Sequence, residues 1–387
     1  MTKRTRGWRH HATTRSPSGC WLALACAVTL AGCASKAAFP DDAAGTRRDA
    51  YIVDSAADTR RDSLFMDAPP PKPKSALHDV KYWAYQIQSL WKTGAIDTLV
   101  ASQYDLVVID PTRSNKAHAN FDTKGAVTKL KASTGLSGKP KIVIAYIDIG
   151  EAESWRDYWE YWWTPPTPGK KGNPSFLLAP DPDGWTNNYP VAYWDDRWKS
   201  VIIHSANSLL KQILDDGFDG VYLDWVEGYL NKDVIAEAKA QKRDPAFEMT
   251  KFIGEMRAYA RKRDPSFLFI QQNAAELGNE RLDSLGLIDA IAQEQIWFDG
   301  KADTEWADAT ACDIKVPATG DKYSQAHYLG KLKLYKDYNV PIFNCEYACG
   351  ANAQAAYQSS SAEGFIPYVS RRPLDRLTDT PPPGYPQ

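Results

Sequence analysis

Histidine is scarce in this chain of 387 residues, and the sequence motifs of several enzyme classes are missing. Of its six histidines, four lie beyond residue 33, without the close spacing of zinc ligands: His78, His118, His204 and His327. There is no Gly-x-x-x-x-Gly-Lys-Ser/Thr phosphate loop and no Gly-x-Ser-x-Gly nucleophile motif. The sequence therefore predicts neither a metal site nor a cofactor, and it argues against phosphate-loop chemistry and serine-type hydrolysis.

The chain also lacks an excess of charge of either sign. It has 46 basic and 48 acidic residues, whereas nucleic-acid-binding proteins carry a basic excess. We therefore expect no nucleic-acid partner. A hydrophobic content of 43% is ordinary for a soluble globular enzyme, and the chain is long enough to bury a sizeable core. We expect a monomer.

The N-terminal apolar run, residues 21–30, is too short to span a membrane as a mature anchor. It follows a basic stretch and ends in Leu-Ala-Gly-Cys at residues 30–33, which resembles the lipobox of bacterial lipoproteins. We predict a signal peptide over residues 1–32 and a lipid on Cys33. Ala34 after this cysteine favours an outer-membrane location, so the only membrane contact expected is through the lipid. An ordinary signal peptide cut at small residues is the alternative.

Two segments show no apolar periodicity. Residues 33–77 are rich in Ala, Asp, Arg and Ser and end in a proline-rich stretch, which predicts a disordered tether. Residues 375–387 contain three consecutive prolines and are predicted to be a disordered tail. Three cysteines remain beyond residue 33, Cys312, Cys345 and Cys349, and one disulfide among them is expected in an oxidising compartment.

Between these segments, short apolar runs alternate with stretches of helical periodicity, which is typical of repeated βα units. Eight such units over residues 78–374 predict an α/β fold, a (β/α)8 TIM barrel. An open, doubly wound parallel sheet is the structural alternative. The expected strands are residues 82–87, 106–110, 142–149, 220–225, 267–273, 290–296, 342–347 and 365–370.

A long loop after the third predicted strand, residues 151–197, is rich in aromatic rings. Seven of the 14 tryptophans of the chain lie between residues 151 and 200. Flat rings cover sugar faces as well as fill cores. We expect roughly half of these rings to pack the loop onto the barrel and the others to line an open groove.

Several predicted strands end in acidic or amide residues, which meet at one face of a barrel. Asp224 and Glu294 each follow a buried run directly and are the best candidates for a catalytic pair. Cleavage of a glycosidic bond needs two such carboxyl groups, because its transition state resembles an oxocarbenium ion. For any single acid the alternative is a structural role, capping a helix or pairing with an arginine.

Several segments resemble glycoside hydrolase family 114, the endo-α-1,4-polygalactosaminidases and their bacterial and archaeal relatives. They include residues 82–88 (YWAYQIQ), 144–153 (IAYIDIGEAE), 217–224 (GFDGVYLD), 271–273 (QQN) and 293–295 (QEQ). The resemblance covers most of residues 80–370. It implies a (β/α)8 barrel, Asp224 and Glu294 as the catalytic pair, and an α-1,4-linked galactosamine polymer as the substrate.

We therefore expect an endo-acting glycoside hydrolase that cleaves an extracellular polysaccharide. The residues expected to bind substrate are Tyr85, Asp148, Glu151, Trp194, Trp225, Asn273 and Glu346. A barrel that binds polysaccharide without cleaving it is the alternative. A metal-dependent deacetylase is a third hypothesis, which the missing histidine cluster disfavours.

Overall fold

The computed structural model describes residues 70–300, 314–320 and 322–386. The predicted signal peptide, Cys33, most of the predicted tether and Cys312 lie outside these residues. Within them, no helix combines the length and the apolar character that crossing a membrane requires.

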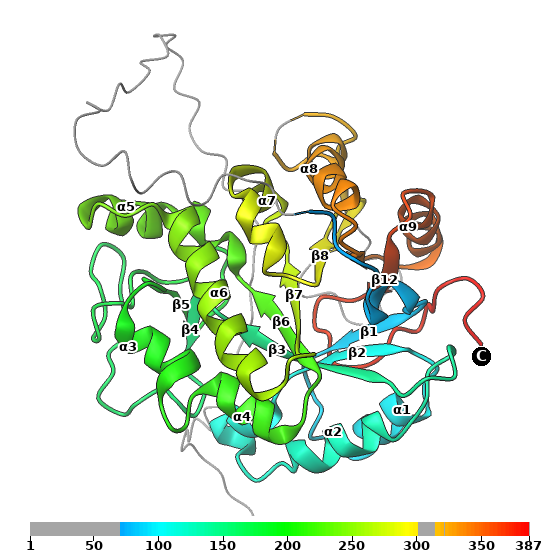
Figure 1. Cartoon of the computed structure of the whole chain (residues 1–387), viewed down its shortest axis with the longest axis horizontal. Helices are drawn as coiled ribbons and strands as arrows, with labels where there is room; N and C mark the ends of the chain where they lie inside the picture. The colour runs from blue at the N-terminus through cyan, green and yellow to red at the C-terminus, as the bar shows by residue number, and fades with distance from the viewer. Residues whose placement is uncertain (1–69, 301–313, 321, 387) are drawn as a thin grey trace, which may run out of the picture. The chain divides into compact units, whose positions relative to one another are not determined.

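The central feature is a sheet of eight parallel strands in which neighbours in space follow the order of the chain (Figure 1). A doubly wound sheet reverses its strand order at a switch point, and this sheet does not. The first and last strands also meet, because the Trp83 indole donates a 2.9 Å hydrogen bond to the Ile366 carbonyl. The predicted (β/α)8 barrel is confirmed. Its strands are β1 (Trp83–Gln86), β2 (Leu106–Ile109), β3 (Ile142–Asp148), β6 (Gly220–Asp224), β7 (Leu268–Gln272), β8 (Ala290–Glu294), β11 (Ile342–Tyr347) and β12 (Ile366–Ser370).

Helices cover the outside of the sheet and return the chain from each strand to the next (Figure 1). The α4 helix shows why they pack there. Its residues Leu209, Leu210 and Ile213 form one buried face, and Gly217, with φ of 84°, ends the helix in the left-handed conformation. The α-helices are α1 (Ala95–Ala101), α2 (Thr123–Lys131), α3 (Asp196–Lys199), α4 (Leu209–Asp216), α5 (Lys232–Ala240), α6 (Pro245–Arg263), α7 (Ala275–Glu280), α8 (Gln325–Asp337) and α9 (Gly350–Ala362).

The chain between β3 and α4 forms an insert that has structure of its own. A two-stranded antiparallel sheet joins β4 (Glu151–Glu153) to β5 (Asn188–Pro190), and α3 follows. Four of the seven tryptophans are buried, namely Trp159, Trp163, Trp194 and Trp198, while Trp162 and Trp185 are exposed. The expectation that about half of the rings pack is confirmed. Trp159, Trp163 and Trp198 form a small ring cluster around Phe176. The Trp163 ring lies 5.2 Å from that of Trp159 and 5.3 Å from that of Phe176, and the Trp198 ring lies 5.8 Å from that of Phe176.

A second excursion, between β8 and α8, was not predicted from the sequence. It begins with β9 (Phe298–Asp299), which pairs with β10 (Ile314–Lys315) in an antiparallel arrangement. Its short strands carry no apolar periodicity that distinguishes them from a loop.

The last part of the predicted tether is packed against the barrel. The Lys72 backbone N–H donates to the Tyr338 carbonyl, and the Asn339 amide donates to the Lys72 carbonyl at 2.6 Å. The Lys72 ammonium donates to the Ile288 carbonyl, and burial lowers the pKa of this lysine to about 8. These partners precede β8 and β11, so the segment docks at the N-terminal ends of the strands.

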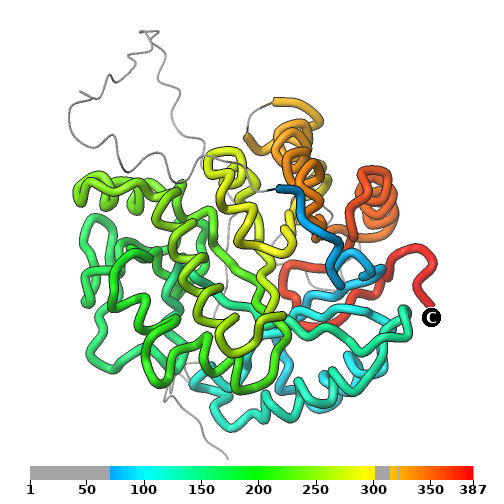
Figure 2. The backbone as a smooth tube through the Cα atoms, viewed as in Figure 1, coloured from blue at the N-terminus to red at the C-terminus, as the bar shows by residue number. Residues whose placement is uncertain are grey.

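The predicted disordered tail is likewise packed, from residue 375 to residue 386. The Tyr385 hydroxyl accepts a 2.6 Å hydrogen bond from the Gln103 backbone N–H, and its ring lies 4.6 Å from that of Tyr104. Figure 2 shows this red segment running back beside the first strands. Both segments were predicted as disordered because they lack periodicity, but they dock through backbone groups and single side chains, which need none.

A buried ion cluster holds the insert to the barrel. Arg156, fully buried in the insert, pairs with Glu153 at 2.7 Å and with Asp110 at the end of β2 at 2.7 Å. A third donor atom of its guanidinium bonds to the Ser114 hydroxyl at 2.7 Å. Asp110 is thus a strand-end acid with a structural role.

Substitution Arg156→Met is expected to lower the free energy of unfolding by about 3–5 kcal/mol, because it leaves two buried carboxyl groups without a counter-charge. Chemical denaturation measures this loss. The control is Arg263→Met, which removes a surface ion pair to Asp215 and is expected to cost at most about 1 kcal/mol. Equal losses in the two variants would contradict the role assigned to the cluster.

Candidate active site

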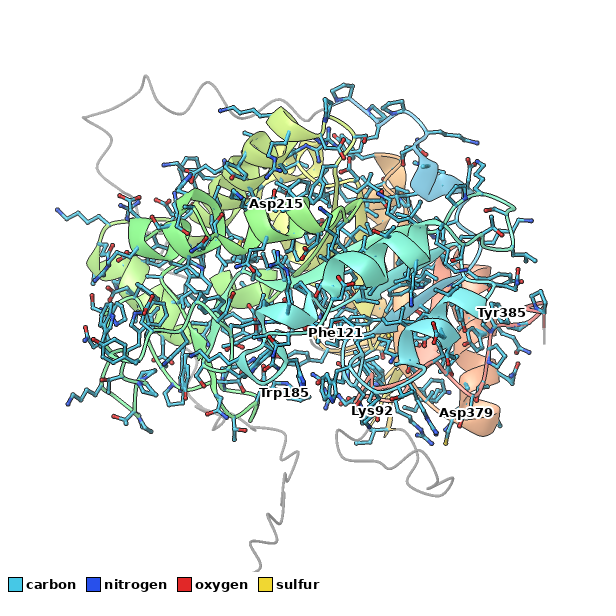
Figure 3. The ribbon with its side chains drawn as sticks, turned by 90° about the horizontal axis from the view of Figure 1, so that it is seen from below. Lys92, Phe121, Trp185, Asp215, Asp379 and Tyr385 are labelled. Atoms are coloured by element: carbon cyan, nitrogen blue, oxygen red, sulfur yellow. The ribbon has the colours of Figure 1, made fainter. Side chains whose placement is uncertain are left out.

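The C-terminal ends of the eight strands and the loops that follow them form what we call the mouth of the barrel. Lys92, Trp185 and Asp379 belong to loops after β1, β3 and β12, and they lie along one edge in Figure 3. Asp215, near the end of α4, lies toward the opposite side. In this fold the mouth is where active sites are built.

Asp224 is the last residue of β6 and is partly exposed in the mouth. Its carboxylate accepts hydrogen bonds from the Tyr146 hydroxyl and, at 2.7 Å, from the Trp225 backbone N–H. Burial and the neighbouring charge of Glu294 raise the pKa of Asp224 to about 7, although the Tyr146 hydrogen bond opposes this rise. Near neutral pH, both the protonated and the ionised form of Asp224 are therefore populated.

Glu294 is the last residue of β8, two strands away from Asp224 around the barrel. Three donors hold its carboxylate: Gln272 at 2.8 Å, Asn273 at 3.2 Å and the Tyr347 hydroxyl at 2.6 Å. Its side chain is thus fixed in one orientation, from three different directions.

The structure brings the two predicted catalytic acids into one electrostatic environment. Burial raises the pKa of Tyr85, in β1, well above its usual range, and the charges of Tyr222, Asp224 and Glu294 add to this rise. Its ring lies 5.0 Å from that of Tyr222. Tyr85 is thus a buried ring of the barrel whose electrostatic environment includes both acids.

Strained backbone positions follow the strands that carry these acids. Trp225, Asn273 and Gln295 come directly after β6, β7 and β8 and have φ values of 56°, 51° and 54°. A left-handed conformation is uncommon for residues other than glycine, and such strain concentrates at functional sites. The turn at Trp225 packs its ring against Gly150 and Gly228, where an added Cβ would come within 2.7 Å of that ring. Trp225 is 8% exposed, and its ring packs between the loop that contains Gly150 and the turn that contains Gly228.

Asn273 was predicted to bind substrate, and the structure shows it bound to Glu294. Its side-chain oxygen accepts a 2.9 Å hydrogen bond from the Glu294 backbone N–H, while its amide nitrogen donates to the Glu294 carboxylate. Asn273 therefore acts as a positioning residue for the carboxyl group.

Asp148 and Glu151 lie beside Asp224. Asp148 ends β3 and is paired in register with Asp224 across the sheet. Asp148 and Glu151 are buried, and each has one carboxyl oxygen without a hydrogen-bond partner. Burial, followed by nearby acids, raises the pKa of Asp148 well above its usual range and that of Glu151 to about 12.

Two predicted substrate-binding residues have their polar groups engaged by partners within the protein. Glu346 is fully buried and accepts hydrogen bonds from the backbone N–H groups of residues 296–298 and from the Asn344 amide. It fixes the chain after β8. Trp194 is 4% exposed, and its indole N–H donates to Gln241 at 2.9 Å, so no ring face is open to a sugar. Both predictions are corrected.

Several acids of the mouth have no cationic partner in the part of the chain that the structure describes. Within the described residues, no ion pair involves Asp148, Glu151, Asp224, Glu227 or Glu294. By contrast, Asp289 pairs with Arg257 and Arg261 outside the mouth. A buried carboxylate normally needs such a partner. Among the residues the structure describes, no group of three or more His, Cys, Asp and Glu side chains is arranged to hold a metal ion.

The sequence analysis missed the two tyrosines that donate to the predicted catalytic pair. Tyr146 lies two residues before Asp148 in β3, and Tyr347 lies two residues after Cys345 in β11. Alternate residues of a strand share a face, so inward-facing tyrosines near the strand ends were a usable signal. Cys345 is a buried, free thiol, so any disulfide of the predicted set would join Cys312 and Cys349, which stays a prediction.

Two solved structures share the fold. The glycoside hydrolase domain of PelA from Pseudomonas aeruginosa aligns with a TM-score of 0.52 and 17% identity, covering 77% of this chain and 97% of that domain. Ega3 of Aspergillus fumigatus, solved in complex with galactosamine, aligns with a TM-score of 0.51 and 16% identity over 80% of this chain and 98% of its own.

Sequence relatives extend over most of the chain. An uncharacterised protein of Deinococcus radiodurans is 32% identical over 310 residues, which cover 80% of this chain and 86% of the relative. A protein of Methanocaldococcus jannaschii is 33% identical over 310 residues, covering 76% and 77%. The model of glycoside-hydrolase family GH114 matches residues 64–382. The chain therefore belongs to family GH114 and is a glycoside hydrolase that acts on a polysaccharide.

Proposed function

We propose that this enzyme cleaves an α-1,4-linked galactosamine polymer internally, with Asp224 and Glu294 as its two catalytic carboxyl groups. The observation that carries the proposal is the set of acids in the mouth that have no cationic partner in the described chain. An amino sugar is a cation that such acids can bind, because charge-assisted hydrogen bonds to carboxylates are strong. The galactosamine bound to Ega3, a protein of the same fold, supports this choice of sugar.

The two carboxyl groups divide the reaction between them. One protonates the oxygen of the leaving sugar, while the other attacks the anomeric carbon or activates water, as in other glycoside hydrolases. Tyr146 stabilises the ionised form of Asp224, and Tyr347, Gln272 and Asn273 orient Glu294. The donors are already in place before substrate binds, which lowers the cost of organising the site.

A barrel that binds polysaccharide without cleaving it is the second candidate function. The exposed rings of Trp162 and Trp185 on the insert favour it, since exposed tryptophan faces stack on sugars. Binding that survives loss of the acids and is lost on removal of these rings, with no products released by the wild type, would favour this function.

Cleavage is tested with de-acetylated α-1,4-galactosaminan and mass spectrometry of the released oligosaccharides. Oligomers are expected from the wild type, while Asp224→Asn and Glu294→Gln should lower the rate roughly 10³-fold or more, because each removes an acid–base or nucleophilic group. Circular dichroism checks that both variants remain folded. Asp196→Asn, an exposed acid of α3, is the matched control and should cleave at the wild-type rate. Unchanged cleavage in both catalytic variants would overturn the assignment of the pair.

The pH profile tests the Tyr146 contact. In Tyr146→Phe the ionised form of Asp224 loses a donor, so the pKa of this carboxyl should rise from about 7 in the wild type. The limb of the kcat/KM profile that reports Asp224 should move to higher pH by roughly one unit. Tyr335→Phe removes a buried hydroxyl between α7 and α8 and should leave the profile in place. A profile of Tyr146→Phe that matches the wild type would refute this role.

We further propose that the protein is exported and carries a lipid on Cys33, which anchors it in the outer membrane. The lipobox-like sequence at residues 30–33 supports this proposal. The full chain, expressed in a Gram-negative host, should fractionate with outer membranes, and Cys33→Ser should abolish metabolic labelling with a radioactive fatty acid. Equal labelling of the wild type and Cys33→Ser would contradict the proposal.

A further inference from the structure

Glu227 is an acid of the mouth to which the proposed reaction assigns no role. It lies three residues after Asp224 in a 3-10 turn, Val226–Leu230, which follows the left-handed residue Trp225. The tight turn keeps Glu227 beside the strand end, where the charge of Asp224, after burial, contributes to raising the pKa of Glu227 to about 8.

The carboxyl group of Glu227 is incompletely satisfied. Its Oε2 atom is buried and has no hydrogen-bond partner, and no lysine or arginine of the described chain forms an ion pair with it. The residue as a whole is partly exposed. The last torsion of a glutamate side chain is broad, so this carboxyl group can rotate when a ligand binds.

The neighbouring acids are less accessible. Asp148 is 2% exposed and Glu151 is 1% exposed. One oxygen of Asp148 is already taken by the backbone N–H groups of Gly150 and Glu151 at 3.0 and 2.7 Å. Of Asp148, Glu151 and Glu227, Glu227 is therefore the one that is partly exposed and can contact a bound sugar.

A shared neighbour links Glu227 to the catalytic pair. Burial raises the pKa of Glu227 while the Asn273 side chain lowers it, and the same side chain donates to the Glu294 carboxylate at 3.2 Å. A cation bound at Glu227 would hold this carboxyl group ionised, and Asn273 would then lie between two carboxylates. The Asn273 amide would thus contribute both to recognition of the ligand and to the orientation of the Glu294 carboxylate.

We propose that Glu227 is a specificity-determining residue that binds the ammonium group of the amino sugar placed next to Asp224 and Glu294. This inference rests on the proposed function, because it takes the sugar to be cationic. Glu227, which lies outside the catalytic pair, would then distinguish a sugar that carries an amine from one that carries a hydroxyl at the same position.

The test compares two monosaccharides, galactosamine and galactose, which differ in the amine. Their affinities are measured by calorimetry or protein-observed NMR for the wild type, Glu227→Gln and Glu160→Gln. The last variant removes an exposed acid of the insert as a matched control. We expect the wild type and Glu160→Gln to bind galactosamine at least about tenfold more tightly than galactose, because one charge-assisted hydrogen bond to the amine is gained. Glu227→Gln should lose this preference and keep its affinity for galactose.

The outcomes separate this inference from the proposed function. A wild-type preference that survives in Glu227→Gln overturns the inference, and so does the absence of any preference in the wild type. The proposed function is decided independently by cleavage of the polymer. Loss of galactose binding as well in Glu227→Gln would assign the residue a structural role and would also overturn the inference.

Discussion

Every strand of the barrel runs in the same direction, and each therefore delivers its last side chain to the same mouth. This constraint places Asp148, Asp224 and Glu294 together although they are far apart in the chain. It also disfavours the simultaneous ionisation of these acids, because carboxylates held close together repel one another. The donors, the strained turns and the aromatic insert all surround this one concentration of carboxyl groups.

The site and the buried ion cluster handle charge in opposite ways. In the ion cluster, Asp110 and Glu153 each have Arg156 beside them. In the mouth, hydrogen bonds from Tyr146 and Tyr347 replace that arginine. A neutral donor orients a carboxyl group without fixing its ionisation, so the proton can still move during the reaction.

The sequence was sufficient to predict the barrel and its catalytic candidates. Each of the eight strands appeared as a short apolar run, and their acidic ends were visible because polarity changes abruptly there, as at Asp224. Roles that depend on three-dimensional neighbours were not visible. Glu346 and Trp194 looked like binding residues, but the structure gives them backbone and side-chain partners that no pattern in the sequence encodes. The docking of Lys72 and Tyr385 could not be predicted for the same reason, because a few specific contacts produce no periodic pattern in the sequence.

The attachment of the segment before β1 has a geometric consequence. Lys72 is bound by groups that precede β8 and β11, at the end of the barrel opposite the mouth. The described chain therefore begins at the end of the barrel opposite the mouth. Figure 3 shows this blue segment on the side away from Trp185 and Lys92. Residues 70–72 therefore leave the loops of the mouth uncovered. A long polymer can lie across the mouth without crossing this segment.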